Sequence, residues 1–281
     1  MSNAEFQGVV QGLVCGVRAD GRELTDIRDV EVLVGTVESA HGSSRVLCGL
    51  VDVVVAIKTE VSTPEPQTPK QGGIHFSVDH AGVCLSESKE HLLSFLSGAF
   101  RQNSQFLESL CIVPGKYCWH IHFDCVVFGA DGPILPFLGL GIKAAAENSS
   151  LPALKLIGEP SVKSSLETDF SDVEFEVDQT EACTAFHEKM EFPLCFSVAR
   201  IAEFLVLDPS ASEEKAASML LHIACDASGN IKKLLKTGPG TFVIGTLKEA
   251  IRVRLSFFME TDMEQIVSEM ACDQMSVDSE S

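Results

Sequence analysis

The chain has 281 residues, of which 45% are hydrophobic and 22% are charged, and this balance supplies a sizeable core and excludes wholesale disorder. At about 150 residues per domain, the length predicts two units or one large one. The 21 Lys and Arg against 40 Asp and Glu give a formal net charge of −19, which argues against a protein that binds nucleic acid without basic partners.

The sequence also argues against membrane insertion and secretion. The longest apolar run, residues 46–57, contains Asp52 and is shorter than the about 20 residues that a bilayer-spanning helix needs. The N-terminus lacks a positively charged start followed by an apolar stretch, so we expect no secretory signal. The ten cysteines form no Cys-x-x-Cys pair and lie mostly in apolar runs, so we expect them to be reduced and buried.

Strand-like alternation of apolar and polar residues dominates the first third of the chain. The predicted strands are 30–34, 45–49, 53–57 and a pair within 74–85 that bends at 80–82. Residues 39–44 are predicted to form a turn between the first two strands. Residues 63–73 contain three prolines and two glycines and are predicted to form a loop.

The hydrophobic period changes from residue 86 onward. Apolar side chains at three-to-four spacing predict one amphipathic helix capped by Ser86 or Ser88: Leu92, Phe95, Leu96, Ala99, Phe106, Leu107 and Leu110. A short strand at 111–113, a turn at Pro114-Gly115 and a long strand at 117–128 are expected next. Residues 131–133 predict a tight turn, with Pro133 in the first turn of a helix that runs to about residue 148.

The second half begins with an acidic stretch. Residues 158–191 hold ten acidic residues against two lysines, which predicts a solvated connection with one edge strand at 173–177. The strands expected after it are 193–199, 204–208, 219–225 and 231–236, with a hairpin turn at 226–229. A capping box at 246–249 predicts a final helix. The order of elements favours an α+β fold with mixed sheets, built as two similar β-sheet and helix halves.

Several motifs, in their order and spacing, give the chain a family resemblance. These motifs are 18–22 (RADGR), 28–32, 42–46, 52–56, 107–112, 118–119 with Asp124, 130–132, 143–146, 196–201, 207–210 and 213–214. Together they resemble the RNase PH-like ring subunits of the RNA exosome. The resemblance implies the RNase PH fold, which is ribosomal protein S5 domain 2-like.

The resemblance also implies a division of the chain. Residues 1–27 are expected to form an N-terminal extension that carries the RADGR segment, and 28–157 the first RNase PH-like half. The acidic connector would cover 158–191, the second half 192–270, and a flexible tail 271–281.

Active members of this family use inorganic phosphate to cleave RNA from its 3′ end. That chemistry needs N–H donors and an arginine around the phosphate, and a carboxylate pair for Mg²⁺ or for proton transfer. The resemblance places the phosphate motif at 131–135, where the hydroxyl position is Ile134 and the arginine position is Leu135. Pro133 has no N–H to offer. We therefore expect that this helix start holds no phosphate.

The catalytic carboxylates of the family also lack counterparts. By the resemblance their positions fall near Ser212 and at Ser218. We interpret Asp208 as a turn residue before Pro209. Glu213 and Glu214 are interpreted as a solvated helix start, although one of them would supply a carboxylate under the alternative. We expect no catalytic, cofactor-binding or metal-binding residues and no enzymatic activity of the chain alone.

Three further patterns have a functional and a structural interpretation. Archaeal relatives carry RNA-facing arginines in the middle helix, where this chain has Ser97, Phe100 and the displaced Arg101. Exposed helix charge is the favoured interpretation of that arginine. Strand alternation places three polar residues on one face, His120, His122 and Asp124, as in a metal triplet; we favour a polar outer face or a subunit contact. The RADGR arginines are interpreted as partners of nearby acids rather than of phosphate.

The leading hypothesis is a non-catalytic structural subunit of the exosome core ring, which supports 3′-to-5′ RNA processing and degradation, including that of rRNA, by other subunits. Expected partners are other RNase PH-like subunits in a hetero-hexameric ring, cap RNA-binding subunits and catalytic nucleases. RNA contact would be at most indirect, and no cofactor or membrane is expected. The nucleus, including the nucleolus, and the cytoplasm are the expected locations. The alternatives are a phosphate-dependent 3′-to-5′ exoribonuclease, a contributor to a shared phosphorolytic site, and a free-standing homo-oligomeric binder.

Overall fold

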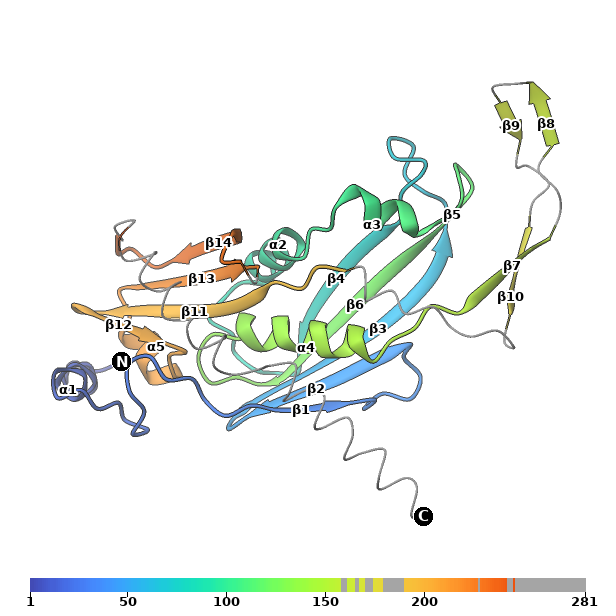
Figure 1. Ribbon diagram of the computed structural model, residues 1–281. Helices are drawn as coiled ribbons and strands as arrows, with labels where there is room; N and C mark the ends of the chain where they lie inside the picture. Colours follow the sequence, from blue (N-terminus) through green and yellow to red (C-terminus); the bar gives the residue numbers. More distant parts are fainter. Residues whose placement is uncertain are drawn as a thin grey trace, which may run out of the picture.

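Two mainly antiparallel sheets, with helices packed between them, form the fold (Figure 1). This computed structural model describes residues 1–157, 161–164, 167–169, 174–178, 190–226, 228–241 and 245. The larger sheet has the order β1 (Glu31–Val34), β2 (Gly42–Cys48), β3 (Val51–Ser62), β6 (Tyr117–Gly129) and β4 (Gly73–His80), and β5 (Cys111–Val113) pairs with β6. The smaller sheet has the order β12 (Phe204–Leu207), β11 (Leu194–Ile201), β13 (Met219–Cys225) and β14 (Ile231–Thr237).

The alternation of the long strands decides which face of the larger sheet is buried. Along β3, every second side chain from Val51 to Ile57 is fully buried. Those of β6 from Ile121 to Val127 follow the same rule. In this register Val55 lies opposite Cys125, and both belong to the main core. The other face of these strands carries the polar residues.

Helices α2 (Lys89–Ala99) and α4 (Leu135–Glu147) lie between the sheets. Helix α4 packs on β2 and β3 with one side and on β11 with the other, and α2 packs on β4 and β14. Two glycines let α4 approach both sheets closely. A Cβ at Gly141 would lie 2.9 Å from Val55 Cγ2, and one at Gly139 would lie 2.8 Å from Cys195 Sγ. The core therefore has one layer of helices that both sheets share.

Two short helices complete the end of the smaller sheet. Helix α5 (Ala211–Ala216) follows β12 and has a capping box, in which Ser210 and Glu213 bond each other's backbone N–H groups. Helix α1 (Asn3–Val14) packs on α5 and buries Leu13 against β11 and β12 residues. The sequence analysis did not predict α1.

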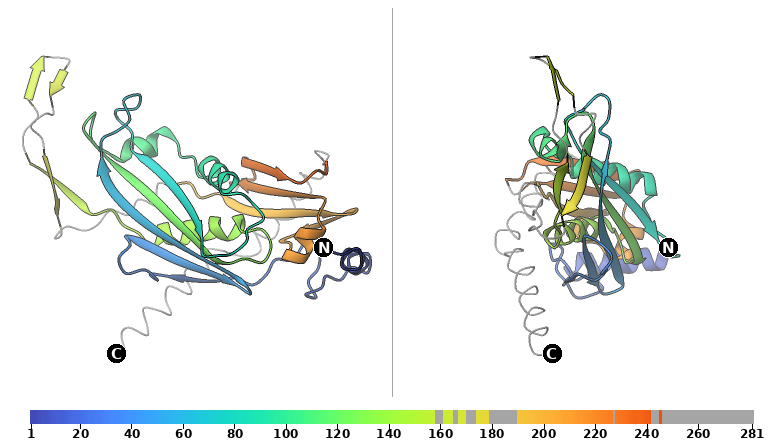
Figure 2. Two further views of the ribbon diagram at one scale, coloured as in Figure 1. Left: turned by 180° about the vertical axis from the view of Figure 1, so that it is seen from behind. Right: turned by 90° about the vertical axis from the view of Figure 1, so that its right-hand side faces the viewer.

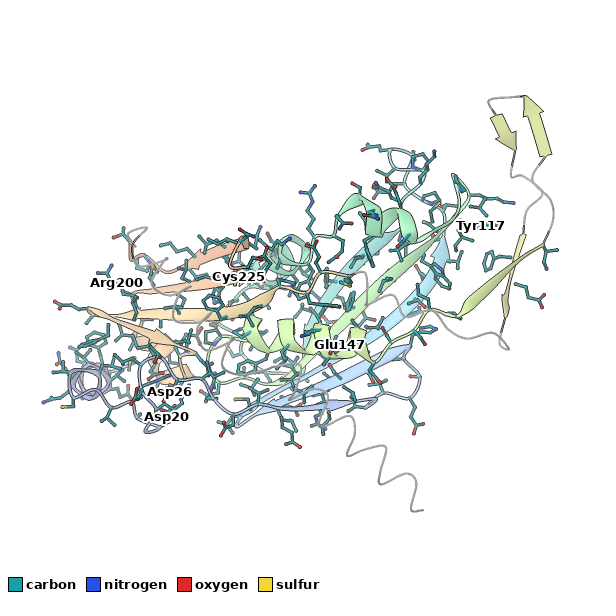
Figure 3. The ribbon with its side chains drawn as sticks, in the orientation of Figure 1. Asp20, Asp26, Tyr117, Glu147, Arg200 and Cys225 are labelled. Carbon is teal, nitrogen blue, oxygen red and sulfur yellow. The ribbon has the colours of Figure 1, made fainter. Side chains whose placement is uncertain are left out.

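Two strand pairs project from the opposite end of the molecule from α1 (Figure 2). Strand β7 (Ala153–Ile157) pairs antiparallel with β10 (Glu174–Asp178), and β8 (Ser161–Ser164) pairs with β9 (Glu167–Asp169). Tyr117, labelled in Figure 3, contacts Phe175 of β10 edge to face, with ring centroids 5.0 Å apart. The strand predicted at 173–177 is confirmed as β10, but it is not the single strand of the acidic stretch, because the described parts also hold β8 and β9.

Most predicted strands and the α+β architecture are confirmed. The single helix predicted from residue 86 is wrong, because it ends at Phe100 and Asn103 caps a separate α3 (Ser104–Ser109). Ser88, one of the two predicted caps, does cap α2. The strand pair within 74–85 is one strand, β4. The proline in the first turn of α4 is Pro136, and Ile134 takes the cap position.

Two predictions concern the ends and the cysteines. The helix predicted from residue 246 lies outside the described residues. Five of the eight described cysteines are buried, as predicted: Cys48, Cys118, Cys125, Cys195 and Cys225. Cys15 and Cys84 are exposed, against that prediction. Within the described part of the chain, none of the helices combines the length and apolar character that a bilayer span requires.

Candidate functional site

By the family resemblance, the start of α4 is the position at which active members of that family would hold phosphate. Ile134 and Leu135 are 0% and 1% exposed, and both belong to the main core. Ile134 provides no side-chain hydrogen bond to the helix start, and Pro136 removes one more N–H from the first turn. An apolar, buried helix start of this kind offers an anion neither charge nor access.

The turn before α4 is occupied by the chain itself. Gly132 has φ +85°, a conformation that favours glycine, and a Cβ there would collide with the carbonyl oxygen of Pro209. The carboxylate of Asp131 accepts a hydrogen bond from the N–H of Ala211 at 2.8 Å. The turn between β12 and α5 is thereby fastened to the helix start, where a ligand would otherwise sit.

Asp208 is the centre of an ion-pair network rather than a simple turn residue. Arg28 donates two hydrogen bonds to its carboxylate, from Nε at 2.9 Å and from Nη2 at 2.7 Å, and Arg22 Nη1 donates a third at 3.1 Å. Burial alone would raise the pKa of Asp208, but the hydrogen bonds and charge of Arg28 outweigh burial and hold the pKa below its ordinary value. Its φ of +46° is rare for a residue with a side chain.

Glu213 is buried, so the prediction of a solvated helix start is wrong for this residue. Arg18 Nε and Nη2 donate to its two carboxylate oxygens at 2.8 and 2.6 Å. The same guanidinium donates to the carbonyl oxygens of Leu207 and Asp208. Asp20 and Asp26, labelled in Figure 3, lie in the same segment at the α1 end of the molecule. The arginines of the RADGR segment therefore pair with nearby acids and backbone, as the sequence analysis favoured.

The two positions expected for catalytic carboxylates hold exposed serines. Ser212 lies on α5, and Ser218 follows α5 and donates its hydroxyl hydrogen bond to the carbonyl of Arg200 at 3.1 Å. Burial raises the pKa of Glu214, the other acid of α5. No pair of carboxylates converges on these serines in the contacts that the described residues make.

The middle helix presents no guanidinium toward the core. Phe100 is buried against Phe76, with ring centroids 5.7 Å apart, and Ser97 and Arg101 are exposed. Arg101 is exposed, as interpreted, but it lies after the end of α2 and is not a helix residue.

His120, His122 and Asp124 share the outer face of β6, as predicted, and His75 of β4 joins them. His75 Nε2 lies 2.8 Å from His120 Nδ1, and the rings of His75 and His122 stack with centroids 4.8 Å apart. Burial lowers the pKa of His75, and the two neighbouring imidazoles add to that effect. Across the part of the chain that the structure describes, no group of three such side chains is placed to hold a metal ion.

Sequence reasoning missed three residues of functional interest: Arg28, Glu87 and His222. Arg28 was noted only as part of a motif, although it links Asp208 to the carbonyl of Asp131 at 2.7 Å. Glu87 and His222 are buried and lie at the junction of the two halves. The available signal for His222 was its place inside the apolar run of β13, because a histidine there must be either paired or neutral.

Comparison with known proteins matches both halves of the chain to one protein family. Residues 26–158 match domain 1 of the 3′ exoribonuclease (RNase PH) family, and residues 191–256 match its domain 2. Among curated relatives, the exosome complex component Rrp42 of Thermococcus kodakarensis is 30% identical over 256 residues, which cover 88% of this chain and 89% of the relative. The same component of Pyrococcus abyssi is 29% identical over 84% of each chain, and that of Methanopyrus kandleri is 25% identical over 86% and 88%.

Solved structures are similar over most of the chain. A chain of an archaeal exosome core matches with a TM-score of 0.70 at 23% identity, covering 90% of this chain and 93% of that one. A chain of the Archaeoglobus fulgidus exosome with RNA bound to the active site matches with a TM-score of 0.71 at 21% identity, covering 92% and 96%. These likenesses establish the RNase PH fold.

Proposed function

The chain belongs to the RNase PH family of 3′ exoribonucleases, and on that premise we propose that it is a non-catalytic subunit of an exosome core ring. In this role it supports 3′-to-5′ RNA processing and degradation, including that of rRNA, by other subunits. The names of its curated relatives and the similarity over most of their length support ring membership.

One observation carries the non-catalytic part of the proposal. The positions that would supply a hydroxyl and an arginine to phosphate are Ile134 and Leu135, and both side chains lie inside the core. A dianion bound there would be surrounded by apolar side chains, which is unfavourable by several kcal/mol or more. Phosphorolysis needs the attacking phosphate in place, so the chain alone lacks the first requirement of the reaction.

The nearby carboxylates support the same conclusion. Asp208 and Glu213 are both held by arginines of residues 18–28, so neither is available to bind Mg²⁺ or to transfer a proton. The equivalent active positions carry Ser212 and Ser218. Two of the three acids that sequence reasoning considered, Asp208 and Glu213, therefore hold the fold through arginines.

The proposed partners are other RNase PH-like subunits in a hetero-hexameric ring, cap subunits that bind RNA, and separate catalytic nucleases. The net charge of −19 agrees with a subunit that touches RNA at most indirectly, because phosphate contacts need cations. We propose that the assembly acts in the nucleus, including the nucleolus, and in the cytoplasm.

A phosphorolysis assay tests this function. The full chain, purified alone, is incubated with a short RNA, with and without inorganic phosphate and Mg²⁺, and nucleoside diphosphates are measured. We expect no phosphate-dependent release. Release that depends on phosphate would contradict the proposal and favour the alternative of a phosphorolytic exoribonuclease.

A second arm separates a structural subunit from a contributor to a shared site. The native assembly is purified with wild-type chain or with Ser212→Ala and Ser218→Ala, which change the two active positions at exposed side chains. Unchanged phosphorolysis by the variants supports the structural role, and a loss of activity with intact assembly contradicts it. Native mass of the same particle should give a hetero-assembly; a particle made of this chain alone would favour a homo-oligomeric binder.

A further inference from the structure

A buried polar cluster lies where the two halves of the fold meet. Glu87 precedes α2 in the first half, and His222 lies on β13 in the second, beside α2 (Figure 1). Their side chains are 2% and 0% exposed, and Glu87 Oε1 lies 3.8 Å from His222 Nε2. Phe95 of α2 contacts the imidazole edge to face, with ring centroids 6.5 Å apart. The pair therefore crosses the junction inside the protein.

A serine contacts each side chain on the side that points away from the other, whereas the two atoms that face each other lack hydrogen bonds. Ser86 Oγ donates to Glu87 Oε2 at 2.7 Å, and Ser197 Oγ lies 2.9 Å from His222 Nδ1. Glu87 Oε1 and His222 Nε2 are buried and have no hydrogen-bond partner. One hydrogen bond would satisfy both atoms, but at 3.8 Å they stand just beyond hydrogen-bond distance and must approach each other to form it.

Among the described residues, none of the groups that act on Glu87 or His222 is a cation that would hold either one in its ionised form. Glu214 of α5 acts on Glu87 as a like charge, and Asp131 and Lys215 act on Glu214. On the His222 side, β11 contributes Ser197 and α2 contributes Phe95. Ionised Glu87 or protonated His222 would therefore depend on the other member of the pair.

The composition Ser197, His222 and Glu87 is that of a hydrolytic triad, but the position is not. Ser197 is 1% exposed, so a substrate carbonyl has no path to its hydroxyl. Nucleophilic chemistry is thus excluded on access, and the remaining role is in holding the two halves together.

We propose that Glu87 and His222 act as one proton-sharing pair, which joins the two halves of the fold and keeps their joint stability constant from mildly acidic to neutral pH. In this pair the carboxyl group of Glu87 faces His222 Nε2 across 3.8 Å, and one proton of the two groups is kept in the folded chain. This role is independent of the proposed place of the chain in an exosome ring.

The proton count of the two states supports this role. Burial raises the pKa of Glu87 to about 7, and burial lowers that of His222 to about 4. In the folded chain between about pH 4.5 and 6.5, Glu87 is protonated and His222 is neutral. In the unfolded chain the ordinary values, 4.5 and 6.5, leave Glu87 ionised and His222 protonated. Each state holds one proton, so unfolding neither takes up nor releases one.

Single variants at the pair are expected to change the pH dependence of the unfolding equilibrium constant in opposite directions. In His222→Asn, Glu87 still keeps its proton only when folded, so the unfolding equilibrium constant rises about tenfold per pH unit, relative to wild type, as pH increases from 4.5 to 6.5. In Glu87→Gln, His222 is neutral only when folded, so the constant rises about tenfold per unit as pH decreases over the same range. The double variant should run parallel to wild type.

The measurement is chemical unfolding of the full chain at half-unit pH intervals between 4.5 and 6.5. Glu108→Gln is the matched control, because it makes the same chemical change at an exposed site, and it should run parallel to wild type. Single variants that run parallel to wild type, or that share one sign of slope, would overturn the proposal.

Nuclear magnetic resonance of the wild-type chain keeps the proposal testable if a variant fails to fold. With ¹⁵N-labelled histidine, the His222 ring is identified by its contacts with Phe95. We expect its nitrogen shifts to keep the neutral pattern down to about pH 5, since burial lowers its pKa. Protonation of this ring near its ordinary pKa of 6.5 would overturn the proposal.

Discussion

Three arginines from one irregular segment organise the junction between the halves at the scale of single residues. Arg18 holds Glu213, Arg22 and Arg28 hold Asp208, and Arg28 also donates to the carbonyl of Asp131. Guanidinium groups suit this task, because each presents several donors in a fixed plane. The acids Asp208, Glu213 and Asp131 are thereby used to fix loops to one another.

The Arg18–Glu213 pair should be essential to stability. Arg18→Met leaves the Glu213 carboxylate buried without its partner and deprives the carbonyls of Leu207 and Asp208 of a donor. We expect a loss of about 3–5 kcal/mol in the free energy of unfolding, measured by denaturant titration. Lys89→Met, which breaks an exposed pair with Asp79, is the control and should cost under about 1 kcal/mol. Equal losses in both variants would contradict the assignment.

Asp208 should govern part of the acid sensitivity of the fold. Its folded pKa lies below the ordinary 3.8, so its ion pairs stabilise the protein fully above about pH 4, and this stability is lost as pH falls through the folded value. Asp208→Asn tolerates the positive φ but loses both arginine pairs. The stability difference between wild type and variant should be largest at neutral pH and should shrink below pH 4, as followed by unfolding at stepwise pH. A difference that stays constant to pH 3 would show that charge is not its cause.

At the scale of elements, α4 is constrained on both sides by glycine contacts. Gly139→Ala places a methyl group 2.8 Å from Cys195 Cβ and should cost about 1–3 kcal/mol, because the shared helix layer has no room for it. Gly8→Ala, in the middle of the exposed part of α1, meets no atom within 4 Å and should stabilise by up to about 1 kcal/mol. Thermal unfolding of both variants checks the prediction, and a stabilised Gly139 variant would contradict it.

Elements with a clear period could be predicted from sequence, and those fixed by tertiary contacts could not. The valine alternation of β3 and the apolar run of β13 identify strands directly. The break between α2 and α3 is invisible to the period, because the apolar positions continue across it while Asn103 caps a new helix. Helix α1 did carry a helical signal, because Phe6, Val9, Val10 and Leu13 stand at three-to-four spacing after the capping residue Ser2, but it was not predicted.

The residue types at the candidate site could be read from the sequence, but the contacts between residues far apart in the chain could not. The apolar character of Ile134 and Leu135 is visible in the sequence and their burial agrees with it, while the absence of a phosphate site there stays a prediction. The pairing of Arg18 with Glu213 spans most of the chain in sequence, so no local pattern signals it. The same holds for Glu87 and His222, whose partners are set by how the halves pack.

At the scale of the whole molecule, the helix start that the resemblance assigns to phosphate lies in the core. Restoring the family motif with Ile134→Thr and Leu135→Arg together should not restore phosphorolysis, because the arginine would be buried without a partner. We expect a loss above about 4 kcal/mol or an insoluble chain, measured by unfolding and soluble yield. Leu50→Arg, at a side chain that is 76% exposed, should be tolerated. A soluble, phosphate-dependent double variant would contradict this.

Helix α4 packs on both sheets, so the chain divides into two segments in sequence, but the two halves cannot be moved apart without exposing their common core. Two polypeptides, 1–157 and 190–281, should therefore copurify when produced together and should each aggregate when produced alone, since each would expose half of a common interior. The division of the chain at 157 and 192 stays a prediction, and this split also tests it. A fold of this kind can change single residues of a site while its two halves stay together, because neither half can bury its apolar interior without the other.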